Sequence, residues 1–201
     1  MKKTTRIVRW ESTADSSRCG IEVCGLEFGE GRLEAELDRA LGRLKGSQPA
    51  FVIAGFASSL PRDLAKAISQ SRDFSSCAHV CLALDYKTLL ALDPAILRNE
   101  KFGVLLDQVD ASTPLSAISA EPVEALRFEE DFVQRASTDL RLSCIVDSML
   151  KLAHDLGLAT LGSTSDSERP QKSGFDFDYV CRAQVSTSAS VTLVAGSARS
   201  S

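Results

Sequence analysis

The 201-residue chain has few of the features that mark specialised classes of protein. Its six cysteines are too few for a disulfide-stapled scaffold of this length, and it holds only two histidines and one tryptophan. No stretch reaches the roughly 18 consecutive apolar residues that a membrane-spanning helix needs. Its 23 basic and 27 acidic residues give a net charge of −4. This charge supplies no general electrostatic reason to bind nucleic acid or an anionic membrane.

The sequence also shows no N-terminal targeting signal, because Met1-Lys2-Lys3 leads into polar residues rather than an apolar segment. We therefore expect a cytoplasmic protein with reduced thiols. Cys81 and Cys144 lie inside apolar runs, where cysteine behaves as a small buried hydrophobe. The chain as a whole is 44% hydrophobic and 25% charged, which is typical of one soluble globular domain.

Apolar runs alternate with helical patterns along most of the chain. Predicted strands cover 21–28, 51–56, 78–84, 102–106, 123–128, 158–161 and 175–181, with an eighth candidate at 6–10. Predicted helices cover 33–44, 61–70, 88–97 and a segment from a cap among 137–139 to Gly157, whose apolar stripe comprises Leu142, Ile145, Val146, Met149, Leu152, Ala153 and Leu156. The alternation predicts one α/β domain over 1–182 with a mainly parallel sheet, followed by a flexible tail over 183–201.

Short motifs between residues 103 and 182 occur in a recognisable order. They are Val104-Leu105-Leu106-Asp107, Pro122-Val123, Leu126-Arg127-Phe128-Glu129, Asp131-Phe132-Val133, the helix end Leu152 to Leu158, and Gly174-Phe175-Asp176-Phe177. In order and spacing this set resembles the EAL family, bacterial phosphodiesterases that hydrolyse cyclic di-GMP. A weaker match places Gly20 to Cys24 at the Glu-Ala-Leu signature. The resemblance implies a modified TIM-like (β/α) barrel, trimmed because a full barrel usually needs about 250 residues.

The resemblance also implies a site at the C-terminal ends of the strands, where the family holds divalent metals and a catalytic lysine. Four residues of this chain stand at positions of that site: Glu22, Asp107, Arg127 and Glu129. Arg127 replaces the lysine, and an arginine stays protonated far above neutral pH, so it cannot accept a proton. Three acids remain that could hold one loose metal site, but acids at strand ends more commonly cap helices and face solvent.

Other matching positions carry side chains that cannot perform the family's chemistry. The metal-binding Asn falls at Phe56 or Ala57, two metal-region glutamates at Ala83 and Ser163, the second acid of an Asp-Asp pair at Gln108, and a phosphate-gripping arginine at Leu26. The resemblance therefore implies a catalytically inactive EAL-like domain without cofactor, bound metal or catalytic residue. It would act on an unidentified protein partner in bacterial signalling or motility control. If the trimmed barrel is open, its sheet edges or apolar surface would be the contact site.

Two other functions remain open. The first alternative is a cyclic di-GMP receptor that binds without cleaving, with Arg127, Arg62 or Arg98 gripping the phosphate. The second is an unrelated α/β enzyme, for which the sequence offers no site. Neither histidine lies near a nucleophile-elbow sequence.

Three further motifs have a structural interpretation that we prefer. Cys77, His79 and Cys81 alternate and would share one face of a strand, but this spacing fits no common zinc motif and spans too far for tight ligation. His154-Asp155 resembles a metal-binding dipeptide, yet it falls in the last turn of a helix, where a histidine complements the dipole. The glycines over 25–31 suggest a turn rather than a phosphate loop, because no Lys-Ser/Thr follows.

Overall fold

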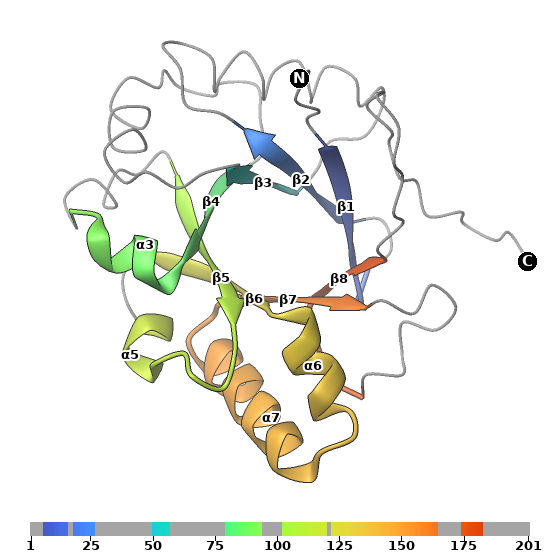
Figure 1. Ribbon diagram of the computed structural model, residues 1–201. Helices are drawn as coiled ribbons and strands as arrows, with labels where there is room; N and C mark the ends of the chain where they lie inside the picture. Colours follow the sequence, from blue (N-terminus) through green and yellow to red (C-terminus); the bar gives the residue numbers. More distant parts are fainter. Residues whose placement is uncertain are drawn as a thin grey trace, which may run out of the picture.

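The structure, a computed structural model, describes residues 6–15, 18–26, 50–56, 79–93, 102–119, 122–164 and 174–182 (Figure 1). Eight strands close into a barrel in the order β1 to β8, with the described helices outside it. The fold predicted from the sequence, a modified TIM-like barrel, is therefore confirmed. The helices predicted over 33–44 and 61–70, the glycine-rich turn after residue 26 and the tail over 183–201 lie outside the described residues.

All eight predicted strands are present. They are β1 (Arg6–Ser12), β2 (Cys19–Leu26), β3 (Phe51–Phe56), β4 (His79–Asp85), β5 (Gly103–Val109), β6 (Val123–Phe128), β7 (Ala159–Thr164) and β8 (Tyr179–Arg182). β1 runs antiparallel to both of its neighbours, β2 and β8, and the remaining neighbours pair in parallel. Because the ring of strands is closed, the described barrel offers no unpaired sheet edge to a partner.

The strands separate two apolar clusters. One contains a residue from each of seven strands and none from a helix, which places it inside the barrel: Trp10, Ile53, Cys81, Leu105, Ala125, Leu161 and Cys181. The larger cluster joins the outward side chains of the strands to the helices. Successive strand residues face opposite sides, so this division fixes which polar side chains point into the barrel.

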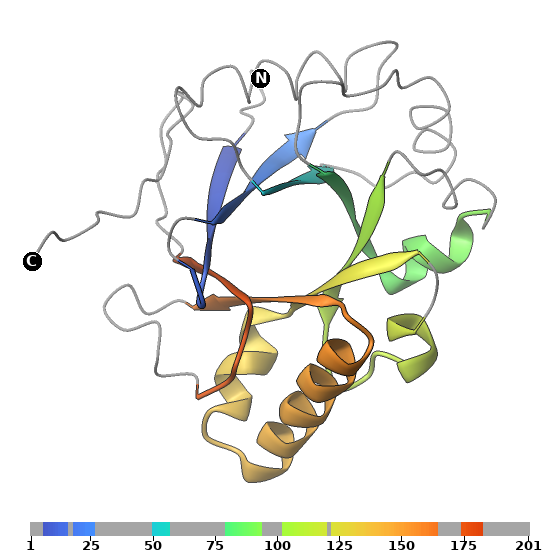
Figure 2. The ribbon, with the colours of Figure 1, turned by 180° about the vertical axis from the view of Figure 1, so that it is seen from behind.

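Four described helices cover one side of the barrel: α3 (Tyr86–Ala91), α5 (Leu115–Ile118), α6 (Glu130–Ala136) and α7 (Leu140–Asp155). They lie outside β4 to β7, as the view from behind also shows (Figure 2). α3 begins two residues before the predicted helix, where Asp85 caps it by accepting a hydrogen bond from the Thr88 amide at 2.7 Å. α6 was not predicted, because seven residues are too short to show a clear helical period. None of the described helices has the length and apolarity that crossing a bilayer requires.

α7 follows its prediction most closely. Asp139 caps its first turn by accepting hydrogen bonds from the amides of Arg141 and Leu142. The predicted stripe is correct in its centre, since Val146, Met149 and Ala153 are buried, but Leu150 is buried as well. Ile145, Leu156 and Cys144 are exposed, so the expectation of a buried Cys144 was wrong. The helix packs through a narrower face than the stripe implied, which leaves its flanks in solvent.

β8 is shorter than predicted. The expected strand over 175–181 begins only at Tyr179, because the preceding residues leave the sheet. The ring of Phe177 lies over Gly162 and packs edge-to-face on Phe128 outside the barrel. Asp178 then accepts hydrogen bonds from both the amide and the hydroxyl of Thr160, each at 2.8 Å. These contacts tie the last strand to β7.

Candidate functional site

Arg127 joins two acids at the C-terminal end of the barrel. It comes from β6, and its guanidinium donates from Nε and Nη2 to the two oxygens of Asp107 on β5, at 2.6 and 2.5 Å. Its Nη1 donates to Glu22 Oε1 on β2, at 2.6 Å. The geometry is a two-point Arg–carboxylate pair extended to a second carboxylate across the barrel. Three residues that the sequence singled out therefore meet in one cluster.

An irregularity in β5 sets the position of Asp107. The pairing of β5 with β6 shifts register between Leu106 and Val109, and Gln108 within that shift has a φ of 57°. This left-handed conformation costs a non-glycine residue about 1 kcal/mol or more. It turns the Gln108 amide back onto Asp107, which accepts its hydrogen bond at 2.7 Å. Asp107 is therefore held by the Gln108 amide of its own strand and by the Arg127 guanidinium from β6.

Trp10 fixes the other acid. Its indole Nε1 donates to Glu22 Oε2 at 3.2 Å, and both side chains are buried. Gly55 on the neighbouring β3 keeps space beside this carboxylate, since a Cβ there would lie 3.2 Å from Glu22 Oε1. A buried charge is tolerated only when it is paired and hydrogen-bonded, and Glu22 meets both conditions. Trp10 is a site residue that sequence reasoning missed, because no motif links it to Glu22.

The cluster is satisfied by donors that belong to the protein. Each of the four carboxylate oxygens of Glu22 and Asp107 accepts at least one hydrogen bond, from Arg127, Trp10 or Gln108. Burial disfavours the charged form of Arg127, but its hydrogen bonds to Asp107 and the charges of Glu22 and Asp107 outweigh this effect. The net result raises the pKa of Arg127 well above its usual range. One cation against two anions leaves the cluster with a net charge of −1.

Glu129 is not part of this cluster. It stands at the N-cap of α6, where its backbone amide donates to the Val109 carbonyl at 2.9 Å. Within the described residues its carboxylate has no hydrogen bond or ion pair with the cluster. Ala83 lines the inside of the barrel. The side chains of Leu26, Phe56 and Ser163, and all of Ala57, fall outside what the structure describes.

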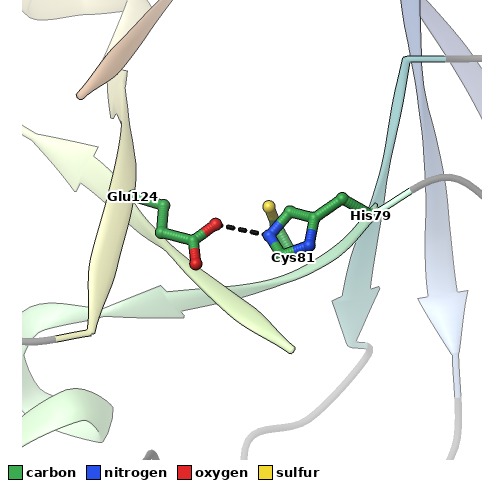
Figure 3. Close-up of side chains that lie close together, drawn as sticks. All are labelled: His79, Cys81 and Glu124. Carbon is green, nitrogen blue, oxygen red and sulfur yellow. Dashed lines mark hydrogen bonds and ion pairs between the residues drawn. The ribbon is translucent and has the colours of Figure 1, made fainter. Parts of the chain in front are cut away.

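A second polar cluster lies near the N-terminal ends of the strands. His79 and Cys81 share the inner face of β4, as their spacing predicted, and Glu124 reaches the imidazole from β6 (Figure 3). Burial, with a smaller contribution from the charge of Glu124, raises the pKa of the Cys81 thiol to about 12. Without a bound cation, Cys81 is therefore a protonated thiol at neutral pH. Cys77 lies outside the described residues, and the sequence did not indicate Glu124.

The other histidine of the chain, His154, lies among groups that connect a helix to two strands. His154 lies in the last turn of α7, and its Nε2 is 3.4 Å from Asp178 and 3.5 Å from the Thr160 hydroxyl. These groups join the end of α7 to β7 and to the start of β8. Among the described residues no cysteine or third ligand approaches it as a metal site would require.

Comparison with solved structures places this fold among EAL domains. The PaMucR phosphodiesterase, in complex with c-di-GMP, superposes with a TM-score of 0.58 at 13% identity over 89% of this chain and 88% of that one. The FimX EAL domain from Pseudomonas aeruginosa, bound to c-di-GMP, gives 0.56 at 14% over 89% and 87%. A cGMP-bound form of the EAL enzyme Bd1971 gives 0.58 at 9% over 89% of this chain, which spans 59% of that longer chain.

These comparisons concern the fold of the chain and not its activity. No protein-family model and no curated protein matches the sequence. The three structures named above have sequence identities of 9 to 14% to this chain and each covers 89% of it. The chain has an EAL-type barrel, and the use it makes of this barrel depends on its own residues.

Proposed function

We propose that this chain is an EAL-family domain that has lost hydrolysis and acts by binding a protein partner. One observation carries the first half of the proposal. The two acids that meet at the C-terminal mouth, Glu22 and Asp107, already have every carboxylate oxygen occupied by a protein donor, and Arg127 supplies their countercharge.

Phosphodiester hydrolysis in such a site requires a divalent cation that activates water and neutralises the phosphate. Such a cation would have to displace the guanidinium of Arg127 from two carboxylates, and Arg127 would then be left unpaired where it is largely buried. Arg127 also cannot serve as a proton acceptor, because its pKa lies far above neutral pH. The methyl group of Ala83, on the inner face of β4, supplies no ligand. These features of the described residues support the proposed loss of hydrolysis.

The charge of the mouth supports a protein partner over a nucleotide. A cyclic dinucleotide carries two negative charges, whereas the cluster of Glu22, Asp107 and Arg127 has a net charge of −1. Its one cation already has all three of its donor nitrogens directed at acids. A scaffold without its chemistry is commonly reused as a binding surface, and the family resemblance points to bacterial signalling or motility control as the process.

The alternative function is a cyclic di-GMP receptor that does not cleave its ligand. It is supported by the bound c-di-GMP in the structures of the PaMucR phosphodiesterase and the FimX EAL domain. In that case Arg127 would have to release Asp107 or Glu22 to reach a phosphate. The other two candidates, Arg62 and Arg98, lie outside the described residues.

Calorimetry distinguishes these functions. Purified protein is titrated with cyclic di-GMP first in EDTA and then in Mn²⁺, and the nucleotide is recovered and analysed for linear product. We expect no heat of binding and no product. Binding without product would instead establish the receptor if it is lost in an Arg127→Ala variant that circular dichroism shows to be folded, but kept in the surface control Lys151→Ala. Mn²⁺-dependent product would overturn the proposed loss of hydrolysis.

A further inference from the structure

A second set of side chains inside the barrel has metal-binding chemistry and lies away from the EAL-type mouth. His79 Nε2, Cys81 Sγ and a Glu124 carboxylate oxygen all lie within 4.8 Å of one another. His79 is the first residue of β4, whereas Asp107 and Arg127 lie toward the C-terminal ends of their strands. The two clusters therefore occupy opposite ends of the barrel. A metal site at the N-terminal end would be independent of the function proposed for the mouth.

A local departure from regular strand structure in β6 brings these groups together. β6 holds one extra residue in its pairing with β5: Val104 pairs with Val123, yet Leu105 pairs with Ala125. This bulge turns Glu124 to the inner face, where it forms a hydrogen-bonded ion pair with His79. In Figure 3 the two side chains point toward one another from β4 and β6, with Cys81 beside the imidazole.

Gly103 provides the room for this contact. It begins β5, the strand between β4 and β6, and pairs with Cys81. A Cβ at this position would lie 2.3 Å from the Glu124 carboxylate and 2.7 Å from His79 Nε2, so any other residue would force the pair apart. A glycine whose replacement meets two ligand atoms marks a close approach rather than a turn, since Gly103 has no positive φ.

We propose that His79, Cys81 and Glu124 bind a thiophilic divalent cation of the zinc type. Imidazole nitrogen, thiolate sulfur and carboxylate oxygen are the zinc ligands of proteins, at about 2.0 to 2.3 Å from the ion. Ligands of a tetrahedral ion at those distances lie about 3.3 to 3.8 Å apart, so the widest pair of ligand atoms must close by roughly 1 Å, whereas His79 Nε2 and the Glu124 carboxylate oxygen, now in hydrogen-bond contact, must move apart to admit the ion. Flexible glutamate and histidine side chains can make such an adjustment.

The charges balance without help from other residues. A divalent cation bound by neutral imidazole, one thiolate and one carboxylate gives a neutral site, as a partly buried position in a barrel requires. On binding, His79 coordinates through Nε2 as a neutral imidazole that carries its proton on Nδ1, and Cys81 releases its thiol proton to solvent. The side chains of His79 and Glu124 are 47% and 46% exposed, so the ion can enter from the N-terminal end and water can fill the fourth position.

The ligand set also selects against the hard cations. Mg²⁺ and Ca²⁺ require six or more oxygen ligands, whereas this cluster offers one carboxylate beside nitrogen and sulfur. A solution of Mg²⁺ should therefore leave the site empty at concentrations where Zn²⁺ or Co²⁺ fills it.

The inner surface of β3 and β8 also carries an aromatic pair, Phe51 and Tyr179, which pack edge-to-face with ring centroids 4.8 Å apart.

Co²⁺ titration of the full chain, stripped of metal with a chelator and held reduced, tests the site. We expect one Co²⁺ per chain, a thiolate-to-cobalt charge-transfer band in the near ultraviolet, and loss of that band on addition of Zn²⁺. Cys81→Ser should abolish the band. His79→Gln and Glu124→Gln should weaken Co²⁺ binding at least about tenfold, because each removes one direct ligand.

The chain offers matched controls, since it has one other histidine and an exposed cysteine among the described residues. His154→Gln and Cys144→Ser should bind Co²⁺ like the wild type. Gly103→Ala keeps every ligand but obstructs their approach, and it should weaken binding as well. Thermal melts by circular dichroism identify any variant that does not fold. The proposal is overturned if the wild type shows no charge-transfer band at one equivalent of Co²⁺, or if folded Cys81→Ser keeps it.

Discussion

Removing Arg127 should be among the most damaging single changes in this protein. The side chains of Arg127, Glu22 and Asp107 are 17, 7 and 17% exposed, so Arg127→Ala would leave two largely buried carboxylates without a countercharge. Breaking a buried ion pair from one side costs about 3–5 kcal/mol. We expect a loss of that size in the free energy of unfolding at neutral pH, because the Trp10 indole and the Gln108 amide still donate to only two of the four carboxylate oxygens and neither carries a charge.

Variants at the same position separate charge from geometry. Arg127→Lys keeps the positive charge but cannot make the two-point contact with Asp107, so we expect a smaller loss of about 1–3 kcal/mol. Lys151→Ala removes an exposed i,i+4 pair with Asp155 and should cost about 0.5 kcal/mol or less. Urea unfolding followed by circular dichroism measures all three values.

The pH dependence has a defined sign. The pKa of Arg127 is raised in the folded state, so its contribution to the free energy of unfolding is complete at pH values below the unfolded-state pKa. This contribution is lost only as the pH rises from the unfolded-state pKa through the higher folded-state pKa. The wild type should therefore show no loss attributable to Arg127 between neutral pH and about pH 10. If Arg127→Ala lowers the free energy of unfolding by less than about 1 kcal/mol at neutral pH, the claim that Arg127 is the countercharge of both acids is refuted.

Three further predictions concern packing, capping and thiol reactivity. Asp139→Ala should cost about 1 kcal/mol in urea unfolding, because it removes the acceptor that caps α7; an unchanged midpoint would contradict this cap. Gly162→Ala should cost about 1–3 kcal/mol, since its Cβ would lie 2.5 Å from the Phe177 ring, and a stabilised variant would show that the ring moves freely. Because burial raises the pKa of Cys81 to about 12, a disulfide reagent at pH 8 should label exposed Cys144 and spare Cys81. Mass spectrometry of digested protein reads both sites, and equal labelling would contradict the burial of Cys81.

Much of the fold could be predicted because its signals are local. Each strand is a short apolar run, and α7 has a capping acid, an apolar stripe and a terminal glycine within one segment. α6 escaped prediction because seven residues carry too little periodicity. The end of β8 was misjudged for another reason: Phe177 is apolar, as a strand residue would be, yet it packs on the outside over Gly162.

The candidate sites, like the fold, were predictable only where the signal is local in the sequence. Acids and an arginine at the ends of parallel strands are expected to converge, and Glu22, Asp107 and Arg127 do so. The register shift at Gln108 and the bulge at Glu124 depend on how β5 and β6 pair, which is information carried by two strands together. For this reason the sequence placed His79 and Cys81 on one face of a strand, where a structural role was the preferred interpretation, and contained no visible signal for Glu124 beside them.

The central claim is that the C-terminal end of this barrel, which holds Glu22, Asp107 and Arg127, does not hydrolyse a phosphodiester. One measurement tests this claim most directly. Cyclic di-GMP is incubated with an equimolar amount of purified protein in Mn²⁺, with a parallel sample in EDTA and an active EAL phosphodiesterase as the positive control. The nucleotides are then separated by chromatography. We predict that cyclic di-GMP is recovered intact while the positive control consumes it. Linear dinucleotide that forms in Mn²⁺, but not in EDTA, would contradict the claim.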